Sequence, residues 1–214
     1  MTEKTANGNN LTALVIDFGG VLTTPMQDAM LRFCHELGIE LQDLMRIALT
    51  AYTGGEDQLV VDFETGRISE EEFVAVFAQR LSEVTEKPVE PEGLVRRIFR
   101  LEIEESMMDL VAAARKAGYR TALCSNSWGT RLYPRERLDP IFDVIVISGE
   151  VGLRKPDPAI FELTVEKLGV DPAGCVFVDD HPGHLMPAEA MGMTTVLHRT
   201  PDETITAVSK LLNL

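Results

Sequence analysis

The chain alternates between short, continuously apolar runs and longer segments whose apolar residues recur at helical spacing. Short runs rich in valine and isoleucine are typical of strands that are buried on both faces of a parallel sheet, whereas helical spacing indicates helices with one buried face. The runs predict five strands, at residues 12–17, 119–124, 143–148, 175–179 and 194–198.

Helical patterns separate these strands in the second half of the chain. They predict helices at residues 107–117, 158–168 and 202–212. The middle helix is the best marked, because Asp157 suits the N-cap, Pro158 the first helical position and Gly169 the C-terminal stop. Alternating strands and helices with short loops predict an α/β fold, a Rossmann-like open parallel sheet with helices on both faces.

About a hundred residues after the first strand break this alternation, because they contain no convincing strand. Their spacing predicts helices at residues 27–37, 41–52, 70–83 and 92–103. Ser69 and Glu72 form a capping-box pattern before the third of these helices. We therefore expect a small α-helical cap at residues 25–103, inserted into a core made of residues 11–24 and 104–214.

Composition excludes several classes of protein. The 214 residues are 45% hydrophobic, which suits a folded globular chain, and the formal net charge of −14 disfavours binding to nucleic acid or to an anionic membrane. No apolar run is long enough to span a bilayer, and the polar N-terminus does not resemble a secretion signal. Three cysteines without metal-ligand spacing predict buried thiols, and we expect a cytoplasmic protein that is a monomer or a homodimer.

Polar side chains stand where four of the predicted strands end. In chain order they are Asp17, Ser125, Asn126, Lys155, Asp179 and Asp180. Ligands of open parallel sheets bind at the carboxyl ends of the strands, so these groups should meet at one rim. Any one of them alone is ordinary loop chemistry, but four such ends in order indicate a functional site.

The carboxylates of that rim need a partner. Two unpaired carboxylates about 4 Å apart repel by about 4 kcal/mol at an effective dielectric near 20, so either one is protonated or a cation lies between them. An all-oxygen site favours Mg²⁺, which also binds substrate phosphates. This arrangement suits covalent catalysis, in which an aspartate attacks phosphorus and water releases the acyl phosphate.

Four motifs in this order and spacing resemble the haloacid dehalogenase (HAD) superfamily. They are DFGGVLT at 17–23, SNS at 125–127, GLRKPDPAIF at 152–161 and VFVDDHPGHL at 176–185. The segment FETGRISEEEF at 63–73 is similar to the helical, C1-type cap of one subfamily. The resemblance covers residues 12 to about 200 and implies a Mg²⁺-dependent hydrolase, most similar to DxG-type sugar-phosphate phosphatases.

The resemblance also implies a role for each matching residue. Asp17 would be the nucleophile, Ser125 and Asn126 would bind the transferring group, and Lys155 would steady it. The implied metal ligands are Asp17, Gly19 through its backbone carbonyl, Asp179 and Asp180. The substrate would be a small phosphorylated metabolite, for example a sugar phosphate, and Trp128 directly after the second motif could stack on it.

Gly19 departs from the family pattern, because related phosphatases usually carry a second aspartate there as the acid and base. Such a group contributes about 10²–10⁴-fold to the rate. A substrate with a good leaving group, such as a sugar 1-phosphate or an acyl phosphate, would need it less. Possible substitutes are His181, His184, Glu56 and Asp57, although the two histidines are more often ordinary surface residues.

Two further hypotheses remain open at this point. A 2-haloacid dehalogenase would also use Asp17 and needs no acid, but such relatives lack the paired Asp179 and Asp180. A catalytically impaired ligand-binding or regulatory protein would keep the pocket and explain Gly19. Candidates for lining the cleft under the cap are Met26, Arg46, Tyr52, Trp128 and Arg131.

Overall fold

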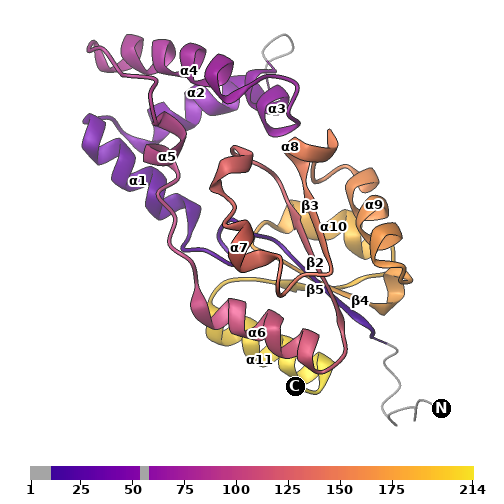
Figure 1. Cartoon of the computed structure of the whole chain (residues 1–214). Coiled ribbons are helices and arrows are strands. Elements are labelled where there is room, and N and C mark those ends of the chain that lie inside the picture. Colours follow the sequence, from indigo (N-terminus) through magenta and orange to yellow (C-terminus); the bar gives the residue numbers. More distant parts are fainter. Residues whose placement is uncertain (1–10, 54–57) are drawn as a thin grey trace, which may run out of the picture.

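The computed structural model describes residues 11–53 and 58–214, and its centre is a five-stranded parallel sheet. The strands are β1 (Ala13–Ile16), β2 (Arg120–Ser125), β3 (Val144–Ile147), β4 (Cys175–Asp179) and β5 (Thr194–Leu197). Their order in the sheet is β3-β2-β1-β4-β5, so the chain crosses over on both sides of β1 (Figure 1). All five strands predicted from the sequence are present, and the α/β fold is confirmed.

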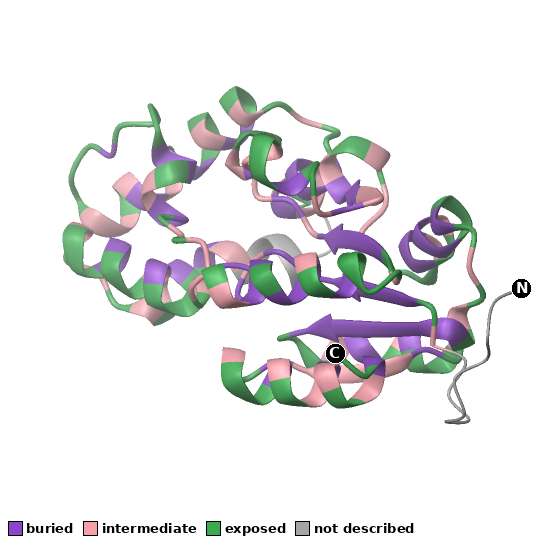
Figure 2. Ribbon diagram, turned by 60° about the horizontal axis from the view of Figure 1, so that its bottom comes forward, coloured by how far each residue is buried: buried purple, intermediate pink, exposed green. Residues whose placement is uncertain are grey.

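Helices cover both faces of the sheet. The larger ones are α6 (Glu105–Lys116), α9 (Pro158–Leu168), α10 (Pro182–Ala190) and α11 (Pro201–Leu212). Alternate residues of β1 supply both cores, because Leu14 and Ile16 pack with α6 and α11 while Ala13 and Val15 pack with α9 and α10. Figure 2 shows the buried strands enclosed by helices whose outer sides are exposed.

Shorter elements connect the strands and helices of this half. They are η1 (Thr130–Leu132), α7 (Arg135–Leu138), α8 (Ser148–Val151) and η2 (Pro172–Gly174). Both caps of α9 are as the sequence predicts, since the Asp157 side chain accepts the Ala159 N–H and Gly169 adopts a left-handed conformation. The three cysteines are buried and unpaired, as expected.

A separate helical layer follows β1, and it contains α1 (Met26–Leu37), α2 (Leu41–Thr53), α3 (Leu59–Glu64), α4 (Glu70–Thr85) and α5 (Leu94–Ile98). These helices share their own apolar cluster, which includes Phe33, Phe73 and Phe77, and they lie beyond the carboxyl ends of the strands in Figure 1. Two antiparallel connections join the layer to the sheet, with a bridge between Thr23 and Ile103. Ser69 and Glu72 form the predicted capping box of α4.

The prediction of a helix at residues 92–103 is wrong beyond Ile98. Helix α5 ends there, and the following residues run back to the sheet beside Thr24, whose N–H donates to the Glu102 carbonyl at 2.8 Å. Phe99 and Leu101 continue the helical apolar spacing, but they face a cavity instead of a helix partner. Helix α3 is not predicted from the sequence, because its six residues are too short to show a period.

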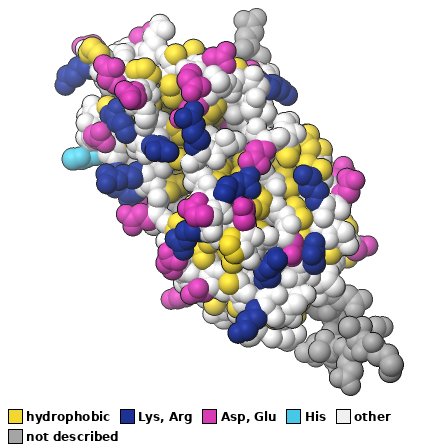
Figure 3. Space-filling model, viewed as in Figure 1, with side chains coloured by type: hydrophobic (Ala, Val, Ile, Leu, Met, Phe, Trp, Pro, Cys, Tyr) yellow, Lys and Arg dark blue, Asp and Glu magenta, His cyan; other side chains and the backbone are white. Residues whose placement is uncertain are grey.

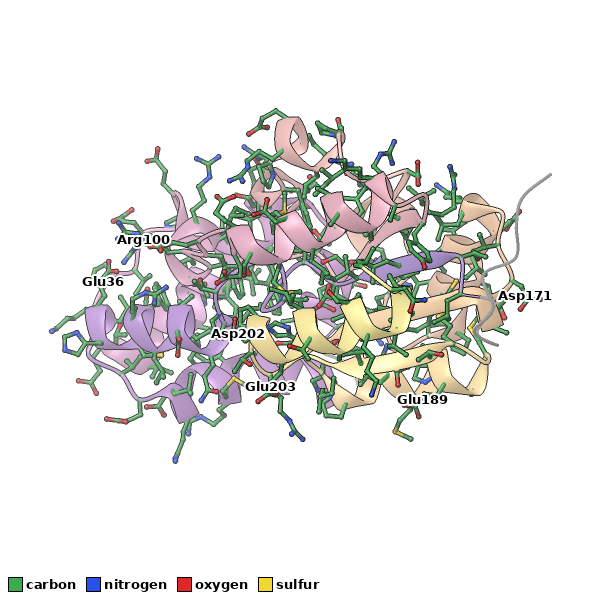
Figure 4. The ribbon with its side chains drawn as sticks, turned by 90° about the horizontal axis from the view of Figure 1, so that it is seen from below. Glu36, Arg100, Asp171, Glu189, Asp202 and Glu203 are labelled. Atoms are coloured by element: carbon green, nitrogen blue, oxygen red, sulfur yellow. The ribbon has the colours of Figure 1, made fainter. Side chains whose placement is uncertain are left out.

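The surface carries the net negative charge in dispersed form. Lysines and arginines alternate with acidic residues on the face shown in Figure 3. The residues labelled in Figure 4 are exposed, and they are Glu36, Arg100, Asp171, Glu189, Asp202 and Glu203. Within residues 11–53 and 58–214, none of the helices combines the length and apolarity that crossing a membrane requires.

Candidate functional site

The carboxyl ends of β1 and β4 bring two acidic side chains to one buried lysine. The N–H of Asp17 donates to the Val178 carbonyl at 2.9 Å, which places Asp17 beside Asp179. Lys155, which is fully buried, lies with its Nζ 2.9 Å from Asp17 Oδ1 and 2.5 Å from Asp179 Oδ2. The sequence prediction that these three residues meet at one rim is thus matched by the geometry.

The charges of this trio perturb one another. Burial alone would lower the pKa of Lys155, but Asp17 and Asp179 outweigh it and raise that pKa above its usual range. Burial would likewise raise the pKa of Asp179, yet Lys155 and His184 overcome it and lower the value to about 2. At Asp17 the burial dominates, so its pKa is raised and Lys155 offsets this only in part.

Asp180 completes a cluster of three carboxylates. One oxygen each from Asp17, Asp179 and Asp180 lie within 4.8 Å of one another. Loss of hydration, then repulsion from Asp17 and Asp179, raises the pKa of Asp180 to about 7. Gly20 allows the close approach, because its φ is +78° and a Cβ there would lie 2.4 Å from Asp180 Oδ2.

This cluster fits a divalent cation. Three carboxylates against one ammonium leave two negative charges, and each carboxylate pair at that separation repels by about 3 kcal/mol at an effective dielectric near 20. A hard divalent cation would relieve this repulsion, and an all-oxygen donor set is the type that Mg²⁺ prefers. Gly19 lies directly beside these residues in the wall of the cavity.

The second predicted motif, residues 125–127, forms part of the rim and also holds the backbone of the loop that carries Lys155. The side-chain amide of Asn126 accepts the Lys155 N–H at 2.8 Å and donates to the Lys155 carbonyl at 3.0 Å. Ser125 Oγ lies 2.9 Å from the hydroxyl of Tyr133, which donates to the Asn126 carbonyl at 3.2 Å. Sequence reasoning missed Tyr133, since no motif marks it, and Asn126 holds the backbone of Lys155 in addition to facing the cavity.

The two histidines of the fourth motif lie beside Asp179. His184 Nδ1 lies 3.0 Å from Asp179 Oδ1, and the backbone N–H of His181 donates to that same oxygen at 2.8 Å. His181 caps α10, since its Nδ1 accepts the Gly183 N–H at 3.1 Å. His181 is exposed and contacts Asp179 through its backbone N–H, as a surface loop histidine can, whereas the partly buried His184 contacts Asp179 through its ring. A part in the chemistry stays a prediction for both.

A cavity of about 510 Å³ opens above Asp17, between the sheet and the helical layer. Asp17, Gly19, Ser125, Asn126 and Asp180 lie in its wall. Its remaining wall is largely apolar and includes Met26, Phe18, Phe99, Leu101, Trp128 and Leu132. A concave, mainly apolar chamber with a few convergent polar groups is the usual form of a small-molecule site.

The helical layer is fixed to the sheet beside this cavity. Glu64 at the end of α3 is buried and pairs with Arg154, whose Nε lies 2.7 Å from Glu64 Oε2. The Ser148 hydroxyl donates to the Glu64 carbonyl at 2.5 Å. The Trp128 ring packs on Phe99 with 4.6 Å between ring centroids. Sequence reasoning did not identify Glu64 or Arg154, because their pairing joins distant parts of the chain.

Two of the other candidates for the cleft, Arg46 and Arg131, fall outside it. Arg46 is exposed and paired with Asp43 at 3.0 Å, and neither Arg46 nor Arg131 lines the cavity. Arg131 pairs with Glu71 at 3.0 Å and so bridges the sheet half to α4. Glu56 and Asp57 lie outside the described residues, as does the side chain of Tyr52.

Comparisons with known proteins agree with this picture. The family model described as haloacid dehalogenase-like hydrolase matches residues 11–192. Bifunctional epoxide hydrolase 2 of Sus scrofa is 29% identical over 94% of this chain, and phosphoserine phosphatase of Thermus thermophilus is 32% identical over 50% of it. The matches cover 39% and 46% of those two proteins, so the chain spans less than half of either.

A solved structure is similar across nearly the whole chain. It is a predicted HAD-like family hydrolase from Porphyromonas gingivalis, with a TM-score of 0.71 and 27% identity over 95% of this chain and 98% of that one. A parallel sheet whose strand ends gather carboxylates and a buried lysine under an apolar cavity defines an α/β protein with a polar site at the carboxyl ends of its strands. The chain belongs to the haloacid dehalogenase-like hydrolase family, and the resemblance noted from its four motifs is confirmed.

Proposed function

We propose that this hydrolase is a Mg²⁺-dependent phosphatase that acts on a small phosphate monoester through a phosphoryl group carried by Asp17. The observation that carries the proposal is the meeting of three carboxylates and one buried ammonium at the floor of a cavity. Two uncompensated negative charges suit a divalent cation and a phosphate, whereas displacement of halide from a haloacid needs no such cluster. The similarity to a phosphoserine phosphatase supports the same reaction class.

Mg²⁺ would be held by Asp17, Asp179, Asp180 and the Gly19 carbonyl, and it would supply charge neutralisation for an anionic nucleophile and an anionic substrate. Asp17 would attack phosphorus and become phosphorylated, and water would then attack the same phosphorus and regenerate the carboxylate. Lys155 would favour the ionised form of Asp17 and orient it, since its Nζ lies 2.9 Å from the Oδ1 atom.

The remaining groups would bind and enclose the substrate. Ser125 and Asn126 line the cavity next to Asp17 and would hold the phosphoryl oxygens. The helical layer at residues 25–103 would act as the cap over this chamber and keep water out, and Trp128 would contact the organic part of the substrate.

A substrate screen tests this proposal. The purified protein is incubated with Mg²⁺ and a broad panel of phosphate monoesters that includes p-nitrophenyl phosphate and sugar phosphates, and inorganic phosphate is measured. We expect release that EDTA and Asp17→Asn both abolish, while Asp43→Asn, a matched change at a half-buried position away from the cavity, leaves it unchanged.

Other outcomes would reject the proposal. Chloride release from chloroacetate without added metal would assign a dehalogenase instead. Mg²⁺-dependent ligand binding without turnover across the whole panel would indicate a binding protein. The missing acid at Gly19 would then explain the absence of turnover.

A further inference from the structure

The thioether of Met26 occupies the space beside Gly19 where a second acidic side chain near Asp17 would lie. Gly19 lies two residues after Asp17 in the cavity wall, and a Cβ added to Gly19 would lie 2.9 Å from the Sδ of Met26. Met26, the first residue of α1, reaches this position from the helical layer. A thioether neither donates nor accepts a proton, so this side of Asp17 offers no acid for a leaving oxygen.

The nearby histidines have other partners at their Nδ1 atoms. That of His181 accepts the Gly183 N–H, and that of His184 contacts Asp179. On the side of Asp17 where Met26 lies, the leaving group of the substrate meets an apolar wall. A reaction in this chamber is favoured when the leaving oxygen is stable as an anion without prior protonation.

Two polar side chains that line the cavity, Arg154 and Tyr133, are engaged by other groups of the protein. Arg154 is the one lysine or arginine among the described residues that line the cavity, and its guanidinium is paired with Glu64. The hydroxyl of Tyr133 is engaged by Ser125 and by the carbonyl of Asn126. The chamber thus presents no excess positive charge that would select a second phosphate or a carboxylate on the substrate.

The organic part of the substrate would lie against aromatic and aliphatic side chains. Phe99 is buried with its ring 4.6 Å from that of Trp128, and the two form a continuous wall of the cavity. The volume of about 510 Å³ is ample for a ring-sized ligand. Burying an apolar group against these rings is favourable by about 25 cal/mol per Å² of surface removed from water.

Within the proposed phosphatase function, we infer that the substrate is a phosphate monoester of an apolar compound with an acidic hydroxyl group, of the phenol or enol class. Two independent features carry this inference: the thioether of Met26 over Gly19, and the apolar wall with its one arginine neutralised. The inference depends on the proposed function and narrows its substrate class.

The bond changes follow from this leaving group. As the oxygen of Asp17 bonds to phosphorus, the ester P–O bond breaks and the departing oxygen keeps the electron pair as a phenolate or enolate. Solvent later protonates that anion. Water then bonds to phosphorus, the P–O bond to Asp17 breaks, and the released phosphate or solvent takes the proton of the water.

Two matched substrate pairs separate the two features. Phenyl phosphate and cyclohexyl phosphate have similar size but differ in the acidity of the leaving hydroxyl, and we expect kcat/KM to favour phenyl phosphate by about 10²–10⁴-fold, the contribution of the missing acid. Phenyl phosphate and 4-carboxyphenyl phosphate both release a phenol, but the second adds a charge. We expect the charged compound to be at least tenfold poorer in kcat/KM.

Variants test the role of the thioether directly. Gly19→Asp with Met26→Ala makes room for an acid, and we expect it to reduce the preference for phenyl over cyclohexyl phosphate. Gly19→Asn with Met26→Ala has the same shape without an acid, and it should keep the preference. Thermal unfolding of each variant shows whether it is folded, and Met26→Leu in the original background should keep the preference as well.

Each outcome has a definite consequence. Equal kcat/KM for phenyl and cyclohexyl phosphate, or better turnover of 4-carboxyphenyl or sugar phosphates, overturns the inference but leaves the phosphatase proposal intact. Absence of hydrolysis of every ester, together with absence of phosphoryl transfer to Asp17, overturns both.

Discussion

Replacing Lys155 by methionine tests the electrostatic core of the site. The change keeps an unbranched side chain of similar length but removes the ammonium. Because the Nζ lies 2.9 Å from Asp17 Oδ1 and 2.5 Å from Asp179 Oδ2, and the side chain is fully buried, two carboxylates lose their shared partner. Breaking a buried ion pair by removing one partner costs about 3–5 kcal/mol.

The assay is urea and thermal unfolding of the wild type and of Lys155→Met in EDTA, so that bound cations do not compensate. For a chain of this size we expect the free energy of unfolding to fall by about 3–5 kcal/mol and Tm by roughly 10 °C. Lys155→Met with Asp179→Asn should recover part of this loss, because one of the two stranded charges is gone.

The stability deficit of Lys155→Met should depend on pH, and the pKa of Asp179 sets the direction of that dependence. The pKa of Asp179 is lowered from 3.8 to about 2 in the folded protein, so its pairing contributes stability that is complete above pH 3.8 and is lost as the pH falls toward 2. In Lys155→Met that contribution is absent and burial raises the folded pKa instead, so the deficit relative to the wild type should shrink as the pH falls from 7 toward 4. A deficit below about 1 kcal/mol, or one independent of pH, would refute this reasoning.

Three further changes have defined outcomes. Tyr133→Phe keeps the ring against Phe18 but removes the hydrogen bonds to Ser125 and to the Asn126 carbonyl. We expect the free energy of unfolding in urea to fall by about 1 kcal/mol and kcat to fall as well. An unchanged kcat would contradict a role of Tyr133 in positioning Ser125. Glu64→Gln removes the negative charge that pairs with the Arg154 guanidinium in the wall of the cavity, so Tm should fall and KM for uncharged aryl phosphates should rise. If KM stays constant, the pair does not shape the chamber. Arg131→Ala removes an exposed bridge between the same two parts of the chain and should change the free energy of unfolding by less than about 1 kcal/mol, which makes it the control for Glu64→Gln.

The sheet and the centre of the site were predictable because both follow from local patterns. A buried parallel strand is a continuous apolar run, and the residue after it necessarily lies at the carboxyl rim. That logic brings Asp17 and Asp179 together, whereas Lys155 follows β3 only after α8 and a loop, and the structure shows how close it lies to both.

The chamber above the rim was not predictable in the same way. Its walls depend on pairings between distant parts of the chain, such as Glu64 with Arg154 and Phe99 with Trp128, which leave no periodic trace in the sequence. The apolar spacing that continues through Phe99 and Leu101 suggests a longer helix, although these side chains face the cavity. The position of Met26 over Gly19 likewise depends on how the helical layer rests on the sheet.

The most direct test of the account is to look for the phosphoryl group itself. The protein is mixed with Mg²⁺ and phenyl phosphate, quenched in acid within the first turnover and digested, and the peptides are analysed by mass spectrometry. The account predicts one added phosphoryl group on the peptide that contains Asp17, lost on prolonged incubation and absent in Asp17→Asn or in EDTA. Turnover of the ester with the phosphoryl group on another residue, or with none on the protein at any time, would contradict it.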